Sequence, residues 1–400
     1  MHDAIVIGAR CAGSSTAMLL ARKGYKVLLV DRATFPSDTM STHVVKSPGG
    51  AKLKNWGLLD KVVAAANCPP IPKITLDFGP FSLTGSAPPA DGVSVDYSPR
   101  RIQLDKVLVD AAVEAGVELR EAFTVEEILT DGERVDGIRG HARGGESITE
   151  KARIVVGADG QHSILARKVG APAYNEKPAL ACYYYTYWSG VPLDGAMICP
   201  RDGRVVIAFP SNDNAACILI GWRNSEFQEY RSDIEGNYLK TLNLVPELAE
   251  RVHAGGRREE RFVGTADLPN FFRKPYGSGW ALVGDAGLHK DPITAQGITD
   301  AFRDAELLAE AIDIGFSGAY SLDDALAAYE QNRNEAATPI YELTCQLASL
   351  DPPPPEMAQL FFALQGNQEQ TDRLIGAIVG TTSVPEFFSP ENVQQIMGIV

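Results

Sequence analysis

The chain has 400 residues, 45% of them hydrophobic, and a formal net charge of −14 at pH 7. A chain of this length can bury two linked cores. Its acidity argues against nucleic acid or an anionic membrane as the main partner, because both are also negative. No apolar run is long enough to cross a bilayer, and the first residues predict a folded strand rather than a signal peptide. The six cysteines are scattered without metal-ligand spacing, so we expect no metal site and a reducing, cytoplasmic location.

The first 31 residues have the pattern of a β-α-β unit. An apolar run at 4–7 predicts a buried strand, 14–23 has helical spacing, and a second apolar run ends on Asp31. Gly8 permits a tight turn after the first strand, and Gly13 lets the helix lie close to it. The helix N-terminus offers free N–H groups to a pyrophosphate, and Asp31 can accept hydrogen bonds from a ribose. The segment predicts a dinucleotide site; a glycine-rich turn in an ordinary α/β protein is the alternative.

Two residues inside this turn need separate comment. Arg10 stands where a glycine normally lets the phosphates approach the backbone, and its guanidinium can fold outward and help to hold the anion. Cys11 is placed where a helix N-terminus can lower the pKa of a thiol, but we expect it to be a small, buried residue.

Two further glycine-aspartate motifs follow apolar runs: Gly-Ala-Asp-Gly at 157–160 and Gly-Asp-Ala at 284–286. Each alone can be a simple turn after a strand. In this order, with the first turn, they resemble the signatures of the FAD-dependent aromatic hydroxylase superfamily. That group has the p-hydroxybenzoate hydroxylase fold and includes geranylgeranyl reductases and flavin halogenases. The resemblance runs from residue 3 to about 315.

The resemblance implies FAD as the cofactor and assigns roles to single residues. Asp159 is shared between the pyrophosphate region and the passage of NAD(P)H, and Asp285 holds the ribityl hydroxyls. Arg101, in an Arg-x-x-Leu motif, approaches the phosphates. The stretch with Pro292 and Gln296 passes the isoalloxazine ring. The implied cofactor-binding set is Gly8, Arg10, Cys11, Ala12, Gly13, Asp31, Arg32, Arg101, Asp159, Gly284, Asp285, Pro292, Gln296 and Gly297.

Two departures from the family pattern concern the flavin edge. Gly287 and Leu288 follow Ala286 where many members have Ala-His, and Ala295 stands where a glycine usually precedes Gln-Gly. Both leave FAD binding in place but change the surroundings expected for the ring.

We therefore expect an α/β fold with a discontinuous, Rossmann-like FAD-binding domain, an inserted, mainly antiparallel β-sheet substrate domain, and a helical C-terminal segment. The inserted sheet is indicated by aromatic and β-branched runs separated by Gly, Pro, Asn and Asp. The expected boundaries are 1–70, 98–177 and 271–320 for the FAD domain, 71–97 and 178–270 for the substrate domain, and 321–400 for the tail.

The substrate is expected on one face of this sheet, over the flavin. Strand alternation places Tyr183, Tyr185 and Tyr187 on one face, and Phe209 and Trp222 are further candidates. An aromatic-lined cavity favours a flat or apolar small molecule. The alternative is that these side chains form the core of the sheet layer. Lys46 falls where relatives often meet flavin or substrate, and we assign it no function from sequence.

The resemblance implies a monooxygenase, or hydroxylase: NAD(P)H reduces FAD, dioxygen forms a C4a-hydroperoxide, and one oxygen atom is transferred to the substrate. Reduced flavin supplied by a partner reductase is an equal possibility. A carbon–carbon double-bond reductase is the main alternative, because residues 31–39 look similar to the geranylgeranyl reductase branch. A flavin halogenase is less favoured because its Trp-x-Trp-x-Ile-Pro motif is not found, and a non-catalytic flavin-binding protein is the remaining alternative. No catalytic residue is assigned.

Overall fold

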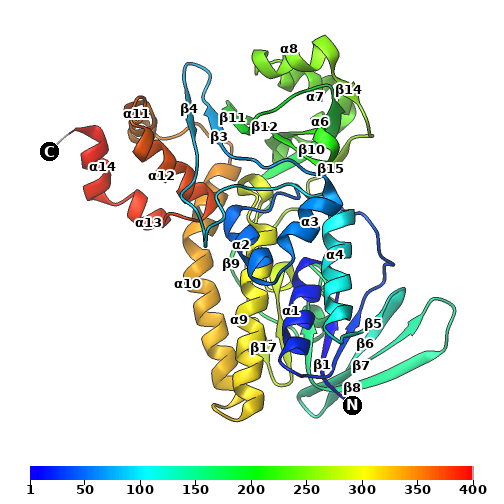
Figure 1. The fold of residues 1–400 in the computed structure, drawn as a ribbon. Helices are drawn as coiled ribbons and strands as arrows, with labels where there is room; N and C mark the ends of the chain where they lie inside the picture. The colour runs from blue at the N-terminus through cyan, green and yellow to red at the C-terminus, as the bar shows by residue number, and fades with distance from the viewer. Residues whose placement is uncertain (399–400) are drawn as a thin grey trace.

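The computed structural model describes residues 1–398, and Figure 1 shows two sheet-containing lobes with a helical C-terminal region beside them. The larger lobe is built on a sheet with the strand order β17-β18-β8-β1-β2-β5. The central pairs β18/β8, β8/β1, β1/β2 and β2/β5 are all parallel. Its strands are β1 (His2–Ile7), β2 (Val27–Val30), β5 (Glu118–Arg120), β8 (Ser147–Gly157), β17 (Tyr276–Gly277) and β18 (Trp280–Leu282).

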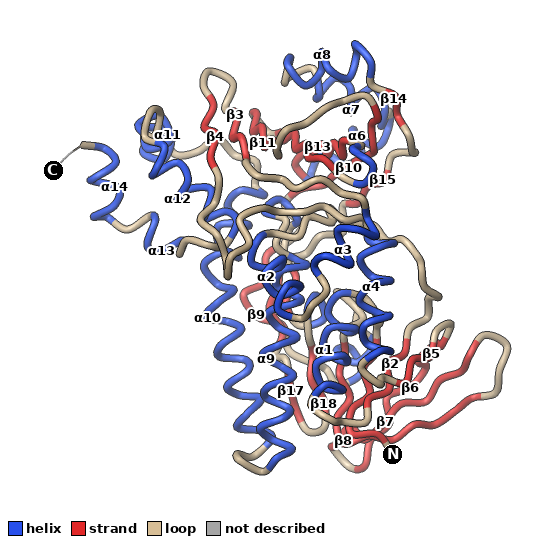
Figure 2. Tube along the Cα trace, in the orientation of Figure 1, coloured by secondary structure: helices blue, strands red, loops and turns tan. Residues whose placement is uncertain are grey.

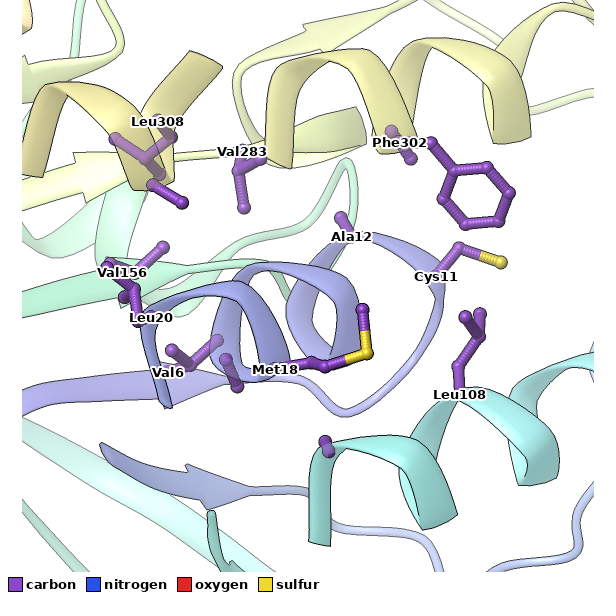
Figure 3. Close-up of a cluster of buried hydrophobic side chains, with 14 of the residues drawn as sticks. Val6, Cys11, Ala12, Met18, Leu20, Leu108, Val156, Val283, Phe302 and Leu308 are labelled. Carbon is purple, nitrogen blue, oxygen red and sulfur yellow. The ribbon is translucent and has the colours of Figure 1, made fainter. Parts of the chain in front are cut away.

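Helices cover this parallel sheet, as is usual for strands that are buried on both faces. All four residues of β2 are buried. In Figure 3, α1 lies between α4 and α9, and Met18 and Phe302 belong to the same apolar cluster. The helices of this lobe are α1 (Cys11–Arg22), α2 (Ser47–Asn55), α3 (Leu59–Ala66), α4 (Arg101–Glu114), α5 (Ile164–Lys168) and α9 (Gly297–Ser317). The first helix begins at Cys11 rather than at residue 14, so the turn between β1 and α1 has fewer residues than predicted and Gly13 lies inside the helix.

Two long strands, β6 (Phe123–Asp131) and β7 (Arg134–Ala142), extend the sheet antiparallel to β8 and project from the lobe, as Figure 2 shows. A small third sheet has the strand order β19-β16-β9; its strands are β9 (Ala173–Lys177), β16 (Asn270–Arg273) and β19 (Leu288–His289).

The second lobe contains a mainly antiparallel sheet in the order β14-β10-β13-β12-β11-β3-β4, with β15 also paired to β10. Only the β11/β3 pair among these is parallel. Its strands are β3 (Ile74–Asp77), β4 (Ser82–Gly85), β10 (Ala181–Ser189), β11 (Ala196–Arg201), β12 (Arg204–Pro210), β13 (Ala216–Arg223), β14 (Arg257–Arg258) and β15 (Val263–Thr265). One face is covered by α6 (Phe227–Ser232), α7 (Ile234–Leu242) and α8 (Pro246–Gly255). The other face turns toward the first lobe.

The C-terminal region is helical and contacts both lobes. The long helix α10 (Leu322–Ala348) packs along α9, and α12 (Gln368–Val379) packs on β4 (Figure 1). Leu83 of β4 and Ile375 of α12 share one apolar cluster. The remaining helices are α11 (Pro355–Ala363), α13 (Val384–Phe387) and α14 (Pro390–Met397). Within residues 1–398, no helix is both long and apolar enough to cross a membrane.

The predicted fold class is confirmed: a Rossmann-like α/β lobe, an inserted antiparallel sheet and a helical C-terminal region are all present.

Candidate flavin and substrate site

The three glycine motifs meet at one edge of the parallel sheet. They follow the neighbouring strands β1, β8 and β18, whose carboxyl ends lie side by side, where ligands of such sheets bind. A Cβ on Gly8 would lie 2.5 Å from the carbonyl oxygen of Ala158, and one on Gly284 would lie 2.8 Å from the Cβ of Ala12. The glycines therefore allow the three turns to touch.

The N-terminus of α1 is free to bind an anion. No side chain caps it, and no acidic residue lies in its first turn. Its N–H groups and dipole thus favour a phosphate there. At the end of β2, the Asp31 carboxylate accepts hydrogen bonds from the backbone of Ala9 at 2.7 Å and Ala33 at 2.8 Å. These bonds hold Asp31 beside the turn, while the neighbouring Arg32 is exposed.

Arg10 does not lie as the sequence predicts. Its guanidinium donates to the fully buried Asp105 at 2.5 Å and to the Ser37 hydroxyl at 3.2 Å. Arg101, the first residue of α4, also donates to Asp105, at 2.9 Å. Arg10 thus links the glycine turn to α4 and to the loop after Asp31, instead of standing free for the anion.

Cys11 lies where the expected role places it, as a small, buried residue. Burial raises its pKa well above the ordinary value, and the nearby Asp105 carboxylate, 3.4 Å away, adds to this. Cys11 is therefore a buried, protonated residue and not an activated thiol.

Two carboxyl groups at this edge have oxygen atoms without a hydrogen-bond partner among residues 1–398. The Asp159 carboxyl accepts one hydrogen bond, from Ile164 N–H at 2.7 Å, while its Oδ1 is buried with none. Burial raises the pKa of Asp159. Asp285 is exposed, and no residue of 1–398 donates a hydrogen bond to its carboxylate. A Cβ on Gly297 would meet nothing within 4 Å. The uncapped N-terminus of α1, the free carboxyl oxygens and the open space at Gly297 fit a bound FAD at this edge of the sheet.

Residues 291–296 include the stretch expected to pass the isoalloxazine ring, and they form hydrogen bonds to the second sheet and to the C-terminal helices. Asp291 begins a short turn (Pro292–Thr294) and accepts a hydrogen bond from the Tyr183 hydroxyl at 2.6 Å. Gln296 donates to the carbonyls of Ile378 at 2.7 Å and Val379 at 3.0 Å in α12. Ala295 has a φ of 52°, the left-handed region in which glycine is favoured. This backbone conformation accounts for the glycine that the family resemblance predicts at this position.

A narrow cavity lies between this stretch and the second sheet, with about 30 Å³ of free volume in this conformation. It must widen to admit a substrate. Its lining is apolar apart from two threonines and one ion pair: Thr42, Val44, Lys46, Ile71, Ile74, Asp96, Ala196, Ile198, Ile207, Phe209, Leu219, Pro292, Ile293, Thr294 and Ala295.

The structure separates the five predicted substrate residues. Phe209 lines the cavity. Tyr183, Tyr185 and Tyr187 lie on the same sheet face and are buried in its apolar cluster. The prediction for Trp222 is wrong. This residue lies on the opposite face of the sheet, where its ring stacks on Tyr230 with 4.5 Å between centroids and its indole N–H donates a hydrogen bond to Thr241 Oγ1. Strand alternation could not decide this, because both faces of the sheet are buried.

Sequence reasoning left Lys46 unassigned and missed its partner. Lys46 Nζ lies 3.2 Å from Asp96 Oδ2, and both side chains are 6% exposed. The two residues are 50 positions apart, so no local spacing predicts the pair.

Fold and site together define a flavin-dependent oxidoreductase. A family model described as an FAD binding domain matches residues 1–344, and the chain belongs to this family. FAD is its cofactor.

Among similar proteins, digeranylgeranylglycerophospholipid reductase 2 of Methanothermobacter thermautotrophicus is 30% identical over 78% of this chain and 79% of its own length. Digeranylgeranylglycerophospholipid reductase 1 of Methanococcoides burtonii is 26% identical over 78% of this chain and 75% of its own. Similar solved structures include the flavin-dependent brominase Bmp2, with a TM-score of 0.83, 20% identity and coverage of 100% and 98%. The probable FAD-dependent monooxygenase PqsL of Pseudomonas aeruginosa has a TM-score of 0.71, 21% identity and coverage of 94% and 98%. These structures show the shared fold.

Proposed function

We propose that this chain is an FAD-dependent monooxygenase that oxygenates a flat or apolar small molecule. The observation that carries the proposal is the cavity between the second sheet and residues 292–295. It is almost closed, mainly apolar, and adjoins the stretch assigned to the flavin ring. A dry chamber beside the ring protects reactive oxygen chemistry from water.

Each part of the chain has a separate task in this proposal. The α1 N-terminus, Arg101 and Asp285 hold the cofactor, and residues 292–297 lie along its ring. Phe209 and its aliphatic neighbours bind the substrate and exclude water. Bound FAD, reduced by NAD(P)H or by a partner reductase, supplies the redox chemistry that activates dioxygen.

Reduction of a carbon–carbon double bond is the second candidate function. It is favoured by the two sequence relatives described above, which are named as reductases and are 26% and 30% identical to this chain. The aliphatic part of the cavity lining, with Ile74, Ile198 and Leu219, also suits a hydrocarbon chain. The brominase shares the fold, but its similarity is too low to carry its reaction to this chain.

Product mass separates the two candidates. The FAD-loaded protein is incubated with NADH or NADPH, ¹⁸O-labelled dioxygen, and two substrate panels, phenols and unsaturated isoprenoid alcohols. Labelled oxygen in an organic product is expected for the monooxygenase. A product that gains two hydrogen atoms without label supports the reductase and overturns oxygen transfer. A variant with Asp285→Ala, which should retain less flavin, serves as a control with reduced flavin loading.

A further inference from the structure

The cavity contains one charged pair in an otherwise uncharged lining. Lys46 and Asp96 both line it, and each side chain is 6% exposed. Burying an ammonium group is costly unless its hydrogen-bonding capacity is used. A lysine in this position therefore calls for a ligand group or for a strong structural reason.

Backbone pairing fixes where the pair stands. Val45 forms a β-bridge with Tyr97, through hydrogen bonds of 2.7 and 3.0 Å in the two directions. This bridge brings the residues next to it, Lys46 and Asp96, together. Asp96 also accepts a hydrogen bond from Ser47 N–H at 2.7 Å. The pair is thus anchored by main chain and not by the side chains alone.

Asp96 has more hydrogen-bonding and charged partners than Lys46 has. The Asp96 carboxylate is stabilised by Lys46, by Ser47 N–H and by the N-terminal end of α2, which begins at Ser47. The Lys46 ammonium has three N–H donors, and Asp96 is the carboxylate paired with it among the described residues. Lys46 therefore has N–H donors left for an oxygen atom in the cavity.

We propose that the substrate carries one acidic oxygen, a phenol or an enol, on an otherwise apolar skeleton, and that Lys46 binds this oxygen. Asp96 is the positioning residue that holds the ammonium at the cavity wall. This inference rests on the proposed function only in placing the substrate in this cavity. It does not depend on whether the flavin transfers oxygen or hydrogen.

The competing explanation is that the ion pair only ties residue 46 to residue 96. Removing either partner would then affect the protein in the same way, through loss of stability. Binding of phenolic and hydrocarbon ligands would change together. The two explanations differ in how ligand preference responds to each variant.

The test compares ligands of the same shape that differ by one hydroxyl. Equilibrium dialysis of the FAD-loaded protein measures binding of 4-methylphenol against 1,4-dimethylbenzene, and of 2-naphthol against 2-methylnaphthalene. We expect the phenol of at least one pair to bind about 10- to 100-fold tighter, as for a hydrogen bond to a charged group. Lys46→Met should abolish the preference and leave hydrocarbon binding unchanged. Asp96→Asn should keep most of the preference, because the asparagine oxygen can still accept a hydrogen bond from the ammonium and hold it in place.

A matched control is available in α2, the helix that begins directly after Lys46. Lys52 of α2 pairs with Glu306 at 2.5 Å and does not line the cavity, so Lys52→Met should keep the preference. If Lys46→Met does not yield folded, FAD-loaded protein, Lys46→Arg must retain the preference, because it keeps the charge. No preference in the wild-type protein for the phenol of either pair, absence of binding included, overturns the proposal. So does an equal loss of preference in Lys46→Met and Asp96→Asn.

Failure here and failure of the proposed function are distinguishable. A preserved phenol preference with no labelled product would leave the acid-oxygen subsite standing and reject oxygen transfer. Labelled product from substrates without an acidic oxygen, together with no preference for phenols in binding, would support oxygen transfer and reject the acid-oxygen subsite.

Discussion

Gly13 in α1 lies directly against Gly8 in the preceding turn: a Cβ on Gly13 would stand 1.7 Å from the Gly8 carbonyl oxygen. The contact is with backbone, so it cannot be relieved by moving a side chain. The helix can approach β1, and offer its N-terminus to the pyrophosphate, only if position 13 has no side chain.

Gly13→Val is therefore expected to yield protein without FAD and to lower the free energy of unfolding by about 1–3 kcal/mol or more through overpacking. The ratio of flavin to protein absorbance after purification and a urea titration measure both effects. Gly255→Ala is the control, because a Cβ there would meet only the Gly190 carbonyl oxygen, at 3.9 Å. A flavin-loaded Gly13→Val protein would show that the cofactor is placed wrongly.

The motifs could be predicted because each depends on local geometry. A strand, a glycine turn and a helix N-terminus follow one another within about a dozen residues, and this local pattern indicates a dinucleotide site. The sheet order then brings the second and third motifs beside the first. Lys46 and Asp96 could not be paired in the same way, because the bridge between Val45 and Tyr97 joins two loops.

The role of Trp222 shows a second limit. Period-two alternation separates the two faces of β13 but does not tell which face turns to the flavin. In a sheet with one face exposed to solvent, the polar residues would identify the exposed face. Here α6–α8 cover the far face, so both faces are apolar, and Trp222 and Phe209 look equivalent in the sequence.

Arg10 is expected to slow the release of FAD. It joins the glycine turn to Asp105 in α4 and to Ser37 in the loop that follows Asp31. Arg10→Gly restores the glycine usual in this motif, yet should weaken FAD binding by about 1–3 kcal/mol, because it breaks charge-assisted hydrogen bonds that hold this loop. Recovery of flavin fluorescence on dilution measures the release rate. Arg22→Gly, at the other end of α1, is the control, and tighter FAD binding in Arg10→Gly would contradict the expectation.

Asp285 should matter for the cofactor and not for folding. Its carboxylate is exposed and accepts no hydrogen bond from residues 1–398, so its removal costs the cofactor-free protein little. Asp285→Ala is expected to weaken FAD binding by about 1–3 kcal/mol through lost hydrogen bonds to the ribityl hydroxyls. Titration of the cofactor-free protein with FAD, followed by flavin fluorescence, measures this. The FAD affinity of Asp285→Asn should lie between those of the wild-type protein and Asp285→Ala. A large drop in the unfolding temperature of cofactor-free Asp285→Ala would instead indicate a structural role.

Asp291 should make stability depend on pH between about 4 and 6. Burial raises the pKa of its carboxyl to about 6, although the hydrogen bond from Tyr183 opposes this shift. The unfolded chain loses the proton near its ordinary pKa of about 3.9, so the folded state binds more protons in this window and stability falls as the pH rises. The loss approaches about 3 kcal/mol above pH 6 as an upper bound, since one pKa unit corresponds to about 1.4 kcal/mol.

Asp291→Asn cannot ionise and keeps an oxygen that can accept from Tyr183 and from Ile293 N–H. Relative to the wild-type protein, this variant should therefore become more stable as the pH rises from about 4.5 to 7. Urea unfolding of both proteins across this range measures the difference, with Asp285→Asn as a control for loss of an exposed carboxylate. Parallel pH profiles for wild type and Asp291→Asn would show that folding does not change the protonation of Asp291 in this range, and would contradict the raised pKa.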